Sequence, residues 1–268
     1  MKGVVNMTEG LMSKAIELLD KAYETHTSVS EPFSVLNPMM TIDEAYAIQI
    51  QRVEAATSKG EVISGKKIGL TSLAMQNLLG VDQPDYGHLF HSMEVPNEGT
   101  VSLSKLFQPK IEGEIAFVLK NDLVGPNVTV EDVLDATDYV IAAIEIVDSR
   151  IKDWKISLVD TVADNASCGL YVLGSKKVNV NDIDLKAIHM ELIKNNGVIN
   201  EGKGTDVLGN PAFCVAWLAN KLHEYNVTLK AGEVILSGAL SAAVVAEPGD
   251  KFTASFSTLG EVKVQFIK

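Results

Sequence analysis

A chain of 268 residues is long enough to bury a sizeable core in one large domain or two small ones. Its formal net charge of −12 argues against nucleic acid and anionic membrane surfaces as partners, because both would repel it. No apolar run approaches the length of a membrane span, and the N-terminus lacks the apolar core of a signal peptide. We therefore expect a cytoplasmic protein in which Cys168 and Cys214 are free, buried thiols.

The first 61 residues are expected to form a helical cap. Thr8 precedes a run of apolar residues at helical spacing, so a first helix is expected to begin there. Thr41 and Glu44 match the capping-box pattern and open a second helix that runs to Gly60. No low-complexity linker follows, so we expect residues 1–61 to be a subdomain packed on a catalytic domain of residues 62–268.

Residues 62–70 predict a strand that carries Lys67. Side chains alternate along a strand, so Lys67 projects between Gly65 and Gly69 on one face. The missing side chains leave room beside the ammonium group for a ligand. A solvated lysine at a sheet edge is the alternative interpretation.

Two polar positions fall in predicted turns. Asp85 lies in a turn-rich loop over 81–88 that follows a short helix over 73–79. A turn aspartate usually accepts hydrogen bonds from nearby backbone N–H groups. A helix over 151–162 is expected to lead into a second polar turn that ends at Ser167. The Ser167 hydroxyl is suited to bind a carboxylate, although backbone capping is the commoner role.

A predicted strand over 109–119 is apolar apart from its basic second residue and two acids. Glu112 and Glu114 lie on the same side of this strand, about 6–7 Å apart from the rise per residue. Gly113, between them, permits close backbone approach on the opposite face.

A second apolar strand, over 139–147, contains one acid, Glu145. A buried, unpaired carboxylate must protonate, find a cation or coordinate a metal. Three acids on two such strands suggest one site for a hard cation with oxygen ligands, Mg²⁺ or Mn²⁺ rather than zinc. The alternative is that these acids lie on exposed strand faces or pair with Lys and Arg.

The C-terminal half is expected to contain a hairpin, one apolar helix and further strands. Its predicted elements are a hairpin over 188–200 that turns at Asn195-Asn196-Gly197, a helix over 210–223, and strands over 168–173, 234–237, 251–256 and 261–266. Strands outnumber helices and rarely alternate with them, so we predict an α+β fold with a mixed or mostly antiparallel sheet. The sequence contains no glycine-rich phosphate loop, dinucleotide-binding fingerprint or nucleophile elbow.

Four motifs in this order resemble the 2-keto-4-pentenoate hydratase (2-hydroxypenta-2,4-dienoate hydratase) family, within the fumarylacetoacetate hydrolase superfamily. The motifs are Lys67-Ile68-Gly69-Leu70-Thr71-Ser72, Gln83-Pro84-Asp85-Tyr86-Gly87, Pro109-Lys110-Ile111-Glu112-Gly113-Glu114-Ile115-Ala116 and Val162-Ala163-Asp164-Asn165-Ala166-Ser167. The similarity extends to Asn210-Pro211 and Ser237-Gly238. It implies a rolled mixed β-sheet core, an N-terminal helical region and a homo-oligomer, often a pentamer or decamer.

The resemblance also implies a set of site residues. The family's metal ligands match Glu112, Glu114 and Glu145, its active-site lysine matches Lys67, and its loop aspartate matches Asp85. The residues implied to lie at the substrate are Leu70, Thr71, Asp164 and Ser167.

The implied reaction is the metal-dependent hydration of 2-hydroxypenta-2,4-dienoate to 4-hydroxy-2-oxopentanoate, in the meta-cleavage of aromatic compounds. The divalent metal would act as a Lewis acid on the developing enolate. Lys67 and Asp85 are the candidates for general acid–base work, and Lys67 is alternatively a fixed positive charge.

Related activities remain open at this point. The first alternative is a decarboxylase of 4-oxalocrotonate (2-oxohex-3-enedioate) or a hydratase of the longer 2-oxohept-enedioate. An acylpyruvate hydrolase is disfavoured, because the helix expected after the first core strand contains no histidine. A non-catalytic partner subunit is disfavoured by the intact acids and Lys67.

Overall fold

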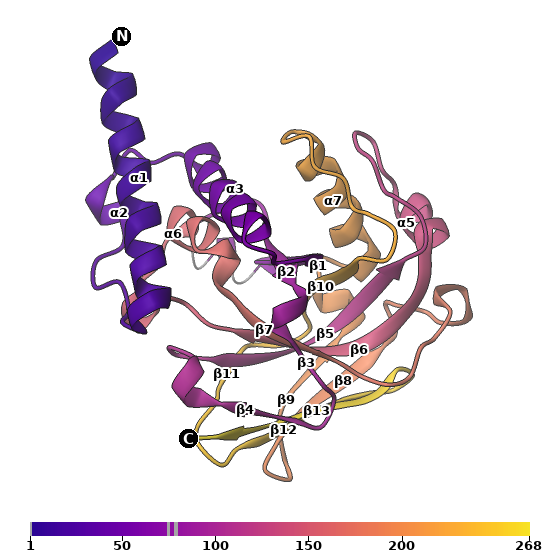
Figure 1. Cartoon of the computed structure of the whole chain (residues 1–268). Helices are drawn as coiled ribbons and strands as arrows, with labels where there is room; N and C mark the ends of the chain where they lie inside the picture. The colour runs from indigo at the N-terminus through magenta and orange to yellow at the C-terminus, as the bar shows by residue number, and fades with distance from the viewer. Residues whose placement is uncertain (1, 74–75, 78–79) are drawn as a thin grey trace.

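The computed structural model describes the backbone of residues 2–73, 76–77 and 80–268, and side chains from residue 10 onward within these ranges (Figure 1). The helices are α1 (Lys2–Thr25), α2 (Phe33–Leu36), α3 (Ile42–Ser58), α5 (Val130–Ala136), α6 (Leu158–Ala163) and α7 (Pro211–His223). The strands are β1 (Ile63–Gly69), β2 (Asp85–Phe90), β3 (Glu94–Val95), β4 (Gly99–Ser102), β5 (Lys110–Leu119), β6 (Thr137–Val147), β7 (Cys168–Leu173), β8 (His189–Lys194), β9 (Gly197–Lys203), β10 (Val234–Ala239), β11 (Val244–Val245), β12 (Lys251–Phe256) and β13 (Gly260–Ile267).

Two sheets form the core of the described chain. The larger sheet has the order β2-β1-β10-β5-β6-β7-β3, with β11 beside β5, and the smaller sheet has the order β4-β13-β12-β8-β9. Parallel pairs (β1 with β10, β3 with β7, β4 with β13) occur among antiparallel ones, so both sheets are mixed, as predicted. The long strands β5 and β6 curve across the smaller sheet, while α1–α3 and α6 lie to one side and α5 and α7 to the other (Figure 1).

The two faces of β5 have different neighbours, as the alternation of its side chains predicts. Ile115 and Phe117 join the large hydrophobic core that continues into the smaller sheet and the helices. Ala116 and Val118 point to the other face, into a separate cluster inside the curved sheet. A Cβ on Gly113 would lie 3.0 Å from the Met190 side chain, so glycine lets the two sheets approach here. Glu112 and Glu114 therefore belong to the inner face of the curved sheet.

The N-terminal helices pack directly on the rest of the chain. The predicted capping box of α3 is confirmed: Thr41 Oγ1 accepts a hydrogen bond from Glu44 N at 3.2 Å, and Glu44 Oε2 accepts one from Thr41 N at 2.8 Å. The α1 helix begins at Lys2, so the predicted start at Thr8 is wrong. Ser34 Oγ donates to Asp160 Oδ2 at 2.6 Å, which ties the helical region to α6.

The expected helix over 151–162 is wrong for most of its length. Residues Lys152–Trp154 form a 3-10 turn, and a helix follows only over Leu158–Ala163. Asp153 and Trp154 have left-handed φ values of 60° and 53°, which an α-helix cannot contain. The Trp154 indole donates to Gln108 O at 3.0 Å, so a tertiary contact holds this irregular segment.

Two further predictions can be compared with the structure. Asp85 begins the strand β2 and does not lie in a turn, since β2 pairs along its length with β1. The predicted hairpin turn is confirmed, because Asn195 and Asn196 have φ values of 51° and 79° between β8 and β9. Part of the helix expected over 73–79 lies outside the described residues. None of the helices in the described ranges combines the length and apolarity needed to cross a membrane.

Candidate active site

Three glutamates converge on the inner face of the larger sheet. Glu112 on β5 pairs directly with Glu145 on β6, and Glu114 lies one step further along the same face. One carboxylate oxygen from each lies within 4.8 Å of the other two. Glu114 and Glu145 are buried, and Glu112 is partly exposed. The predicted convergence of these acids is therefore present in the fold.

These carboxylates have more oxygen atoms than the surrounding groups satisfy. Glu114 Oε2 accepts the Gly238 N–H at 2.8 Å, but Glu114 Oε1 has no hydrogen-bond partner among the described residues. Glu145 Oε1 lies 3.2 Å from Lys67 Nζ, and its hydrogen-bonding capacity is otherwise unfilled by the described residues. Burial and the neighbouring acids raise the pKa of Glu112 to about 7 and also raise the pKa of Glu114. A bound divalent cation would pair with the unfilled carboxylate oxygens and would offset the repulsion between the three acids. This set of oxygen donors therefore fits a hard metal ion.

Lys67 extends from β1 across the curved sheet to the acids. Its Nζ lies 3.2 Å from Glu145 Oε1, and the side chain is buried. Burial alone would lower the pKa of Lys67, but the charges of Glu145 and Asp85 outweigh it and hold the pKa above its usual value. The ammonium group is therefore a fixed positive charge beside the acidic cluster.

Asp85 faces Lys67 across Gly69. A Cβ placed on Gly69 would lie 2.2 Å from Asp85 Oδ1 and 3.3 Å from Lys67 Nζ, so both polar atoms lie over this glycine. Burial raises the pKa of Asp85, despite the opposing effect of Lys67. Asp85 Oδ1 has no hydrogen-bond partner among the described residues, whereas Oδ2 lies 3.4 Å from Thr161 Oγ1.

The segment after β1 reaches the same end of the sheet. Leu70 has a left-handed φ of 57°, which turns the chain out of the strand. Thr71 is buried against Gly238, where a Cβ would lie 2.1 Å from Thr71 Oγ1. Because the Gly238 N–H binds Glu114, Thr71 lies close to the acids.

The turn from Asp164 to Ser167 points its two ends in different directions. Asp164 is buried and accepts hydrogen bonds from the N–H and Nε of Arg150, at 2.9 and 2.7 Å. Ser167 Oγ lies 3.3 Å from Thr161 Oγ1, on the side of Asp85. Ser167 thus joins the site, while Asp164 faces Arg150. Sequence reasoning missed both Arg150 and Thr161, which belong to no recognised motif.

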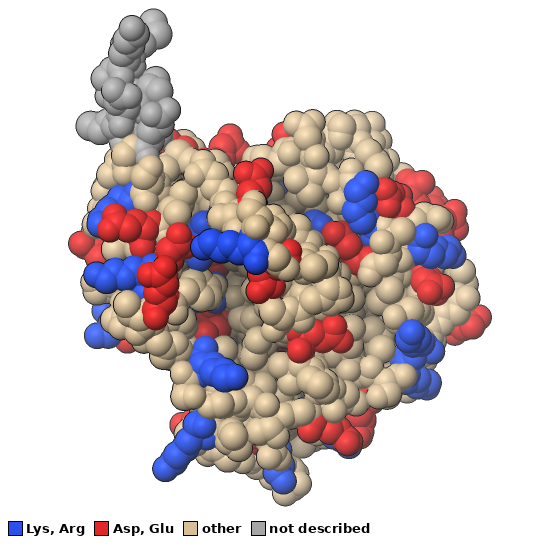
Figure 2. All heavy atoms as spheres, in the orientation of Figure 1, with Lys and Arg blue, Asp and Glu red and all other residues tan. Residues whose placement is uncertain are grey.

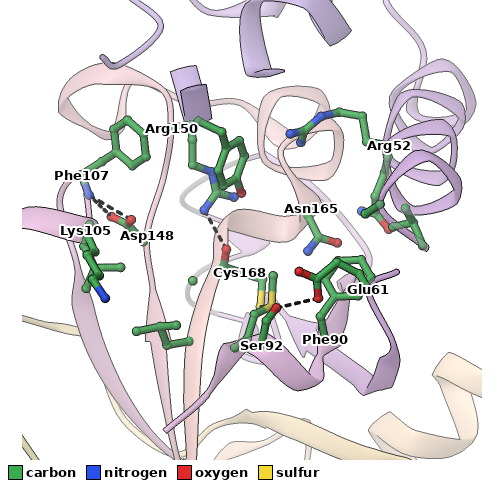
Figure 3. A pocket seen from close by; sticks show the side chains of 18 of the residues that line it. Arg52, Glu61, Phe90, Ser92, Lys105, Phe107, Asp148, Arg150, Asn165 and Cys168 are labelled. Carbon is green, nitrogen blue, oxygen red and sulfur yellow. Dashed lines mark hydrogen bonds between the residues drawn. The ribbon is translucent and has the colours of Figure 1, made fainter. Parts of the chain in front are cut away.

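A cavity of about 410 Å³ lies behind this turn (Figure 3). Arg52, Phe107, Arg150 and Asn165 are among its lining residues, while the three glutamates and Lys67 are not. The Asn165 side chain accepts the His88 N–H at 2.8 Å and donates to His88 O at 2.9 Å, which fastens the turn to β2. Paired hydrogen bonds to β2 therefore hold Asn165, one of the residues that line the cavity. Elsewhere on this side of the molecule, acidic and basic side chains are interspersed (Figure 2).

Comparison with known proteins identifies the family. A model of the fumarylacetoacetate (FAA) hydrolase C-terminal family matches residues 81–267. The chain is 48% identical to a 2-hydroxyhexa-2,4-dienoate hydratase of Comamonas testosteroni, over 88% of this chain and 90% of that protein. It is 43% identical to a 2-keto-4-pentenoate hydratase of Paraburkholderia xenovorans (strain LB400), over 97% of this chain and 96% of that protein.

A solved structure supports the same superfamily. The 4-oxalocrotonate decarboxylase from Pseudomonas putida G7, complexed with magnesium and adipate, superposes with a TM-score of 0.93 at 37% identity. The match covers 97% of this chain and 98% of that one. The curved mixed sheet, the order of the motifs and these relatives agree, and the chain belongs to the 2-keto-4-pentenoate hydratase family within the fumarylacetoacetate hydrolase superfamily.

Proposed function

We propose that the protein is a hydro-lyase that adds water to 2-hydroxypenta-2,4-dienoate and releases 4-hydroxy-2-oxopentanoate, in aromatic meta-cleavage catabolism. The observation that carries this proposal is the cluster of three glutamates with unpartnered oxygens beside Lys67 and Asp85. The names of the relatives, which act on short dienoates, support the same reaction.

The cofactor in this proposal is a divalent metal, Mg²⁺ or Mn²⁺, held by Glu112, Glu114 and Glu145. When bound, the ion supplies Lewis-acid stabilisation to the substrate carboxylate and the oxygen on C2. The relative from Pseudomonas putida G7 is complexed with magnesium, which supports a hard divalent cation as the cofactor.

In this scheme Asp85 takes part in proton transfer and Lys67 acts as a fixed positive charge. The dienol loses the proton of its C2 hydroxyl and gains one at C5, which gives a conjugated enone. Water then adds at C4, and C3 takes up the equivalent of the proton that leaves this water. Asp85 Oδ1, which is buried and unpartnered, is placed to accept the proton that leaves the attacking water. Lys67 supplies a positive charge beside the developing negative charge, which a buried site makes effective.

The remaining predicted residues orient the substrate. We assign Leu70, Thr71 and Ser167 to the carboxylate end, because the fold brings Thr71 and Ser167 to the two sides of the site. Asp164 acts through Arg150 and shapes the turn that presents Ser167. We also propose that residues 1–61 form a helical cap on a catalytic domain of residues 62–268. The protein is further proposed to be a homo-oligomer, a pentamer or decamer, and light scattering would measure its mass.

The direct test follows the dienol. Purified protein is incubated with Mg²⁺ or Mn²⁺ and freshly prepared 2-hydroxypenta-2,4-dienoate, and loss of the dienol absorbance is recorded together with the appearance of 4-hydroxy-2-oxopentanoate. Turnover that is abolished by a chelator and restored by the ion is the expected result. No turnover of any short dienoate in the presence of either ion would remove the proposal.

One other activity has a specific observation in its favour. The TM-score of 0.93 to a decarboxylase of 4-oxalocrotonate makes that substrate the second candidate. Incubation with 4-oxalocrotonate and measurement of released CO₂ separates the two reactions. We expect hydration to be the faster activity.

A further inference from the structure

Thr161 lies between two residues of the proposed site. It comes from α6 and is buried, and its Oγ1 lies 3.4 Å from Asp85 Oδ2 and 3.3 Å from Ser167 Oγ. The three groups come from separate parts of the chain, namely a strand, a helix and a turn. Thr161 is therefore the direct link between the proposed base and the turn beside it.

The chemistry of the groups fixes the direction of these hydrogen bonds. An ionised carboxylate can only accept, and a threonine hydroxyl has a single proton to donate. When Asp85 is ionised, Thr161 must donate to it and can only accept from Ser167. The donated protons therefore run from Ser167 to Thr161 to Asp85.

The hydrogen bonds from Ser167 through Thr161 reach only one of the two oxygens of the Asp85 carboxylate. Oδ2 is held by Thr161, while Oδ1 lies over Gly69, near Lys67 Nζ, without a partner among the described residues. The backbone N–H groups of Gly69 and Asp85 also act on this carboxylate, and the Thr161 hydroxyl adds a side-chain donor directed at Oδ2. The hydrogen bond thus keeps the free oxygen aimed at the same point as the ammonium group of Lys67.

The turn over 165–167, which supplies Ser167 at the start of the hydrogen-bond chain, has a strained backbone. Residues 165–167 all have left-handed φ values, of 56°, 51° and 51°. Such values cost about 1–3 kcal/mol per residue other than glycine and persist only where the surroundings enforce them. Two sets of contacts do so here, the pair of Arg150 with Asp164 and the paired bonds of Asn165 with His88 (Figure 3 shows Arg150 and Asn165). The fold therefore fixes Ser167 where its hydroxyl reaches Thr161.

We propose that Thr161 is a positioning residue that orients the Asp85 carboxylate through a directed chain of hydrogen bonds starting at Ser167. The inference rests on the proposed hydratase function, in which Asp85 Oδ1 accepts a proton. It adds a residue that touches neither the metal ligands nor, in this scheme, the reacting atoms.

The test compares three variants with the wild-type protein in the presence of Mg²⁺. Thr161→Val keeps the size of the side chain but removes the donor, and we expect kcat to fall by about 10–100-fold while KM changes by less than about 3-fold. Thr161→Ser restores a hydroxyl and is expected to recover kcat to within about 3-fold of wild type. Thr137→Val is the matched control, since Thr137 is also buried but bonds Val133 O at 2.6 Å, far along β6 from the acids.

A double-mutant cycle tests the direction of the chain. The cycle is measured at saturating substrate, where a lost contact of Ser167 with the substrate carboxylate appears in KM. If Ser167 acts on Asp85 only through Thr161, adding Ser167→Ala to Thr161→Val then causes no further loss of kcat. Fully additive losses would overturn the chain.

Two further outcomes would overturn the inference. They are a Thr161→Val enzyme with wild-type kcat, and a Thr161→Ser enzyme as slow as Thr161→Val. Circular dichroism and melting curves establish that the variants are folded, and Thr161→Ala replaces Thr161→Val if the valine variant does not fold. A wild-type protein that is inactive on every short dienoate would instead refute the proposed function, so the two failures are distinguishable.

Discussion

At the scale of single residues, the acidic cluster is both a cost to the fold and the proposed source of its chemistry. Glu114 Oε1 is buried without a hydrogen-bond partner among the described residues, and Glu145 is buried with Lys67 as its counter-charge. Like charges in one buried site repel, so a neutral replacement should stabilise the protein when no cation is bound and destabilise it relative to wild type when the ion is saturating.

Glu114→Gln tests this reversal. We expect the metal-free variant to melt at or above the temperature of the metal-free wild type, because the fold no longer has to bury an ionisable carboxyl among other acids. We expect its affinity for Mn²⁺ to fall by more than about 10-fold and its turnover to be abolished. Calorimetric titration and melting curves with and without Mn²⁺ measure both effects. Wild-type affinity and full activity in this variant would exclude Glu114 as a ligand.

Gly69 controls the approach of Asp85 to Lys67. A methyl group at this position would lie 2.2 Å from Asp85 Oδ1, so Gly69→Ala must displace the carboxylate. Displacement of a catalytic group by about 1 Å can cost about 100-fold in rate, and we expect a loss of kcat of this order. Gly10→Ala is the control, since a Cβ there meets nothing within 4 Å. Steady-state kinetics distinguish the two variants, and equal activities would refute the role of Gly69.

At the scale of elements, β5 and β6 were predicted from the sequence, whereas β2 was predicted as a loop and the segment before α6 as a helix. The turn between β8 and β9 was predicted correctly. The alternation on β5 placed Glu112 and Glu114 on one face because a regular strand has a period of two. The segment 152–157 was predicted as helix and is irregular, because its conformation depends on a tertiary contact of Trp154. The same kind of long-range contact creates the left-handed turn over 165–167. Local sequence patterns contain no information on such contacts, so Thr161 was not predicted.

The turn over 165–167 should depend on the buried pair of Arg150 and Asp164. Asp164→Asn removes the charge that faces the guanidinium and leaves it buried without a counter-ion. Removal of one partner of such a pair typically costs about 3–5 kcal/mol. We expect a loss of this size in urea unfolding, together with a lower kcat because Ser167 is no longer fixed. Glu17→Gln breaks the exposed pair with Lys14 and should cost less than about 1 kcal/mol. Similar losses in the two variants would contradict the assigned role.

At the scale of the whole molecule, one continuous core joins the helical region to both sheets, and a buried polar layer lies at their junction. In this layer Gln49, from α3, donates through Nε2 to the backbone of β2 and lies 3.1 Å, through Oε1, from His88 Nδ1. Burial, and to a lesser extent the charge of Lys66, lower the pKa of His88 to about 3. The folded protein therefore requires a neutral imidazole where α3, β2 and the turn over 165–167 meet.

This requirement makes global stability depend on pH. Between pH about 6.5 and 3 the unfolded chain binds a proton at His88 that the folded protein does not bind, so the free energy of unfolding falls as the pH falls. The contribution reaches at most about 1.4 kcal/mol per pH unit for one proton. The raised pKa of Glu112 has the opposite effect on the free energy of unfolding, because there the folded protein binds the extra proton. This effect is the same in wild type and in a variant changed only at His88. His88→Asn removes the titrating ring but offers an amide toward Gln49, so the difference between the two proteins isolates His88. The free energy of unfolding is measured with urea at pH 7.5, 6.5 and 5.5. Below pH 6.5 the wild type should lose more stability than His88→Asn. Equal losses in the two proteins would mean that His88 is protonated in the folded state.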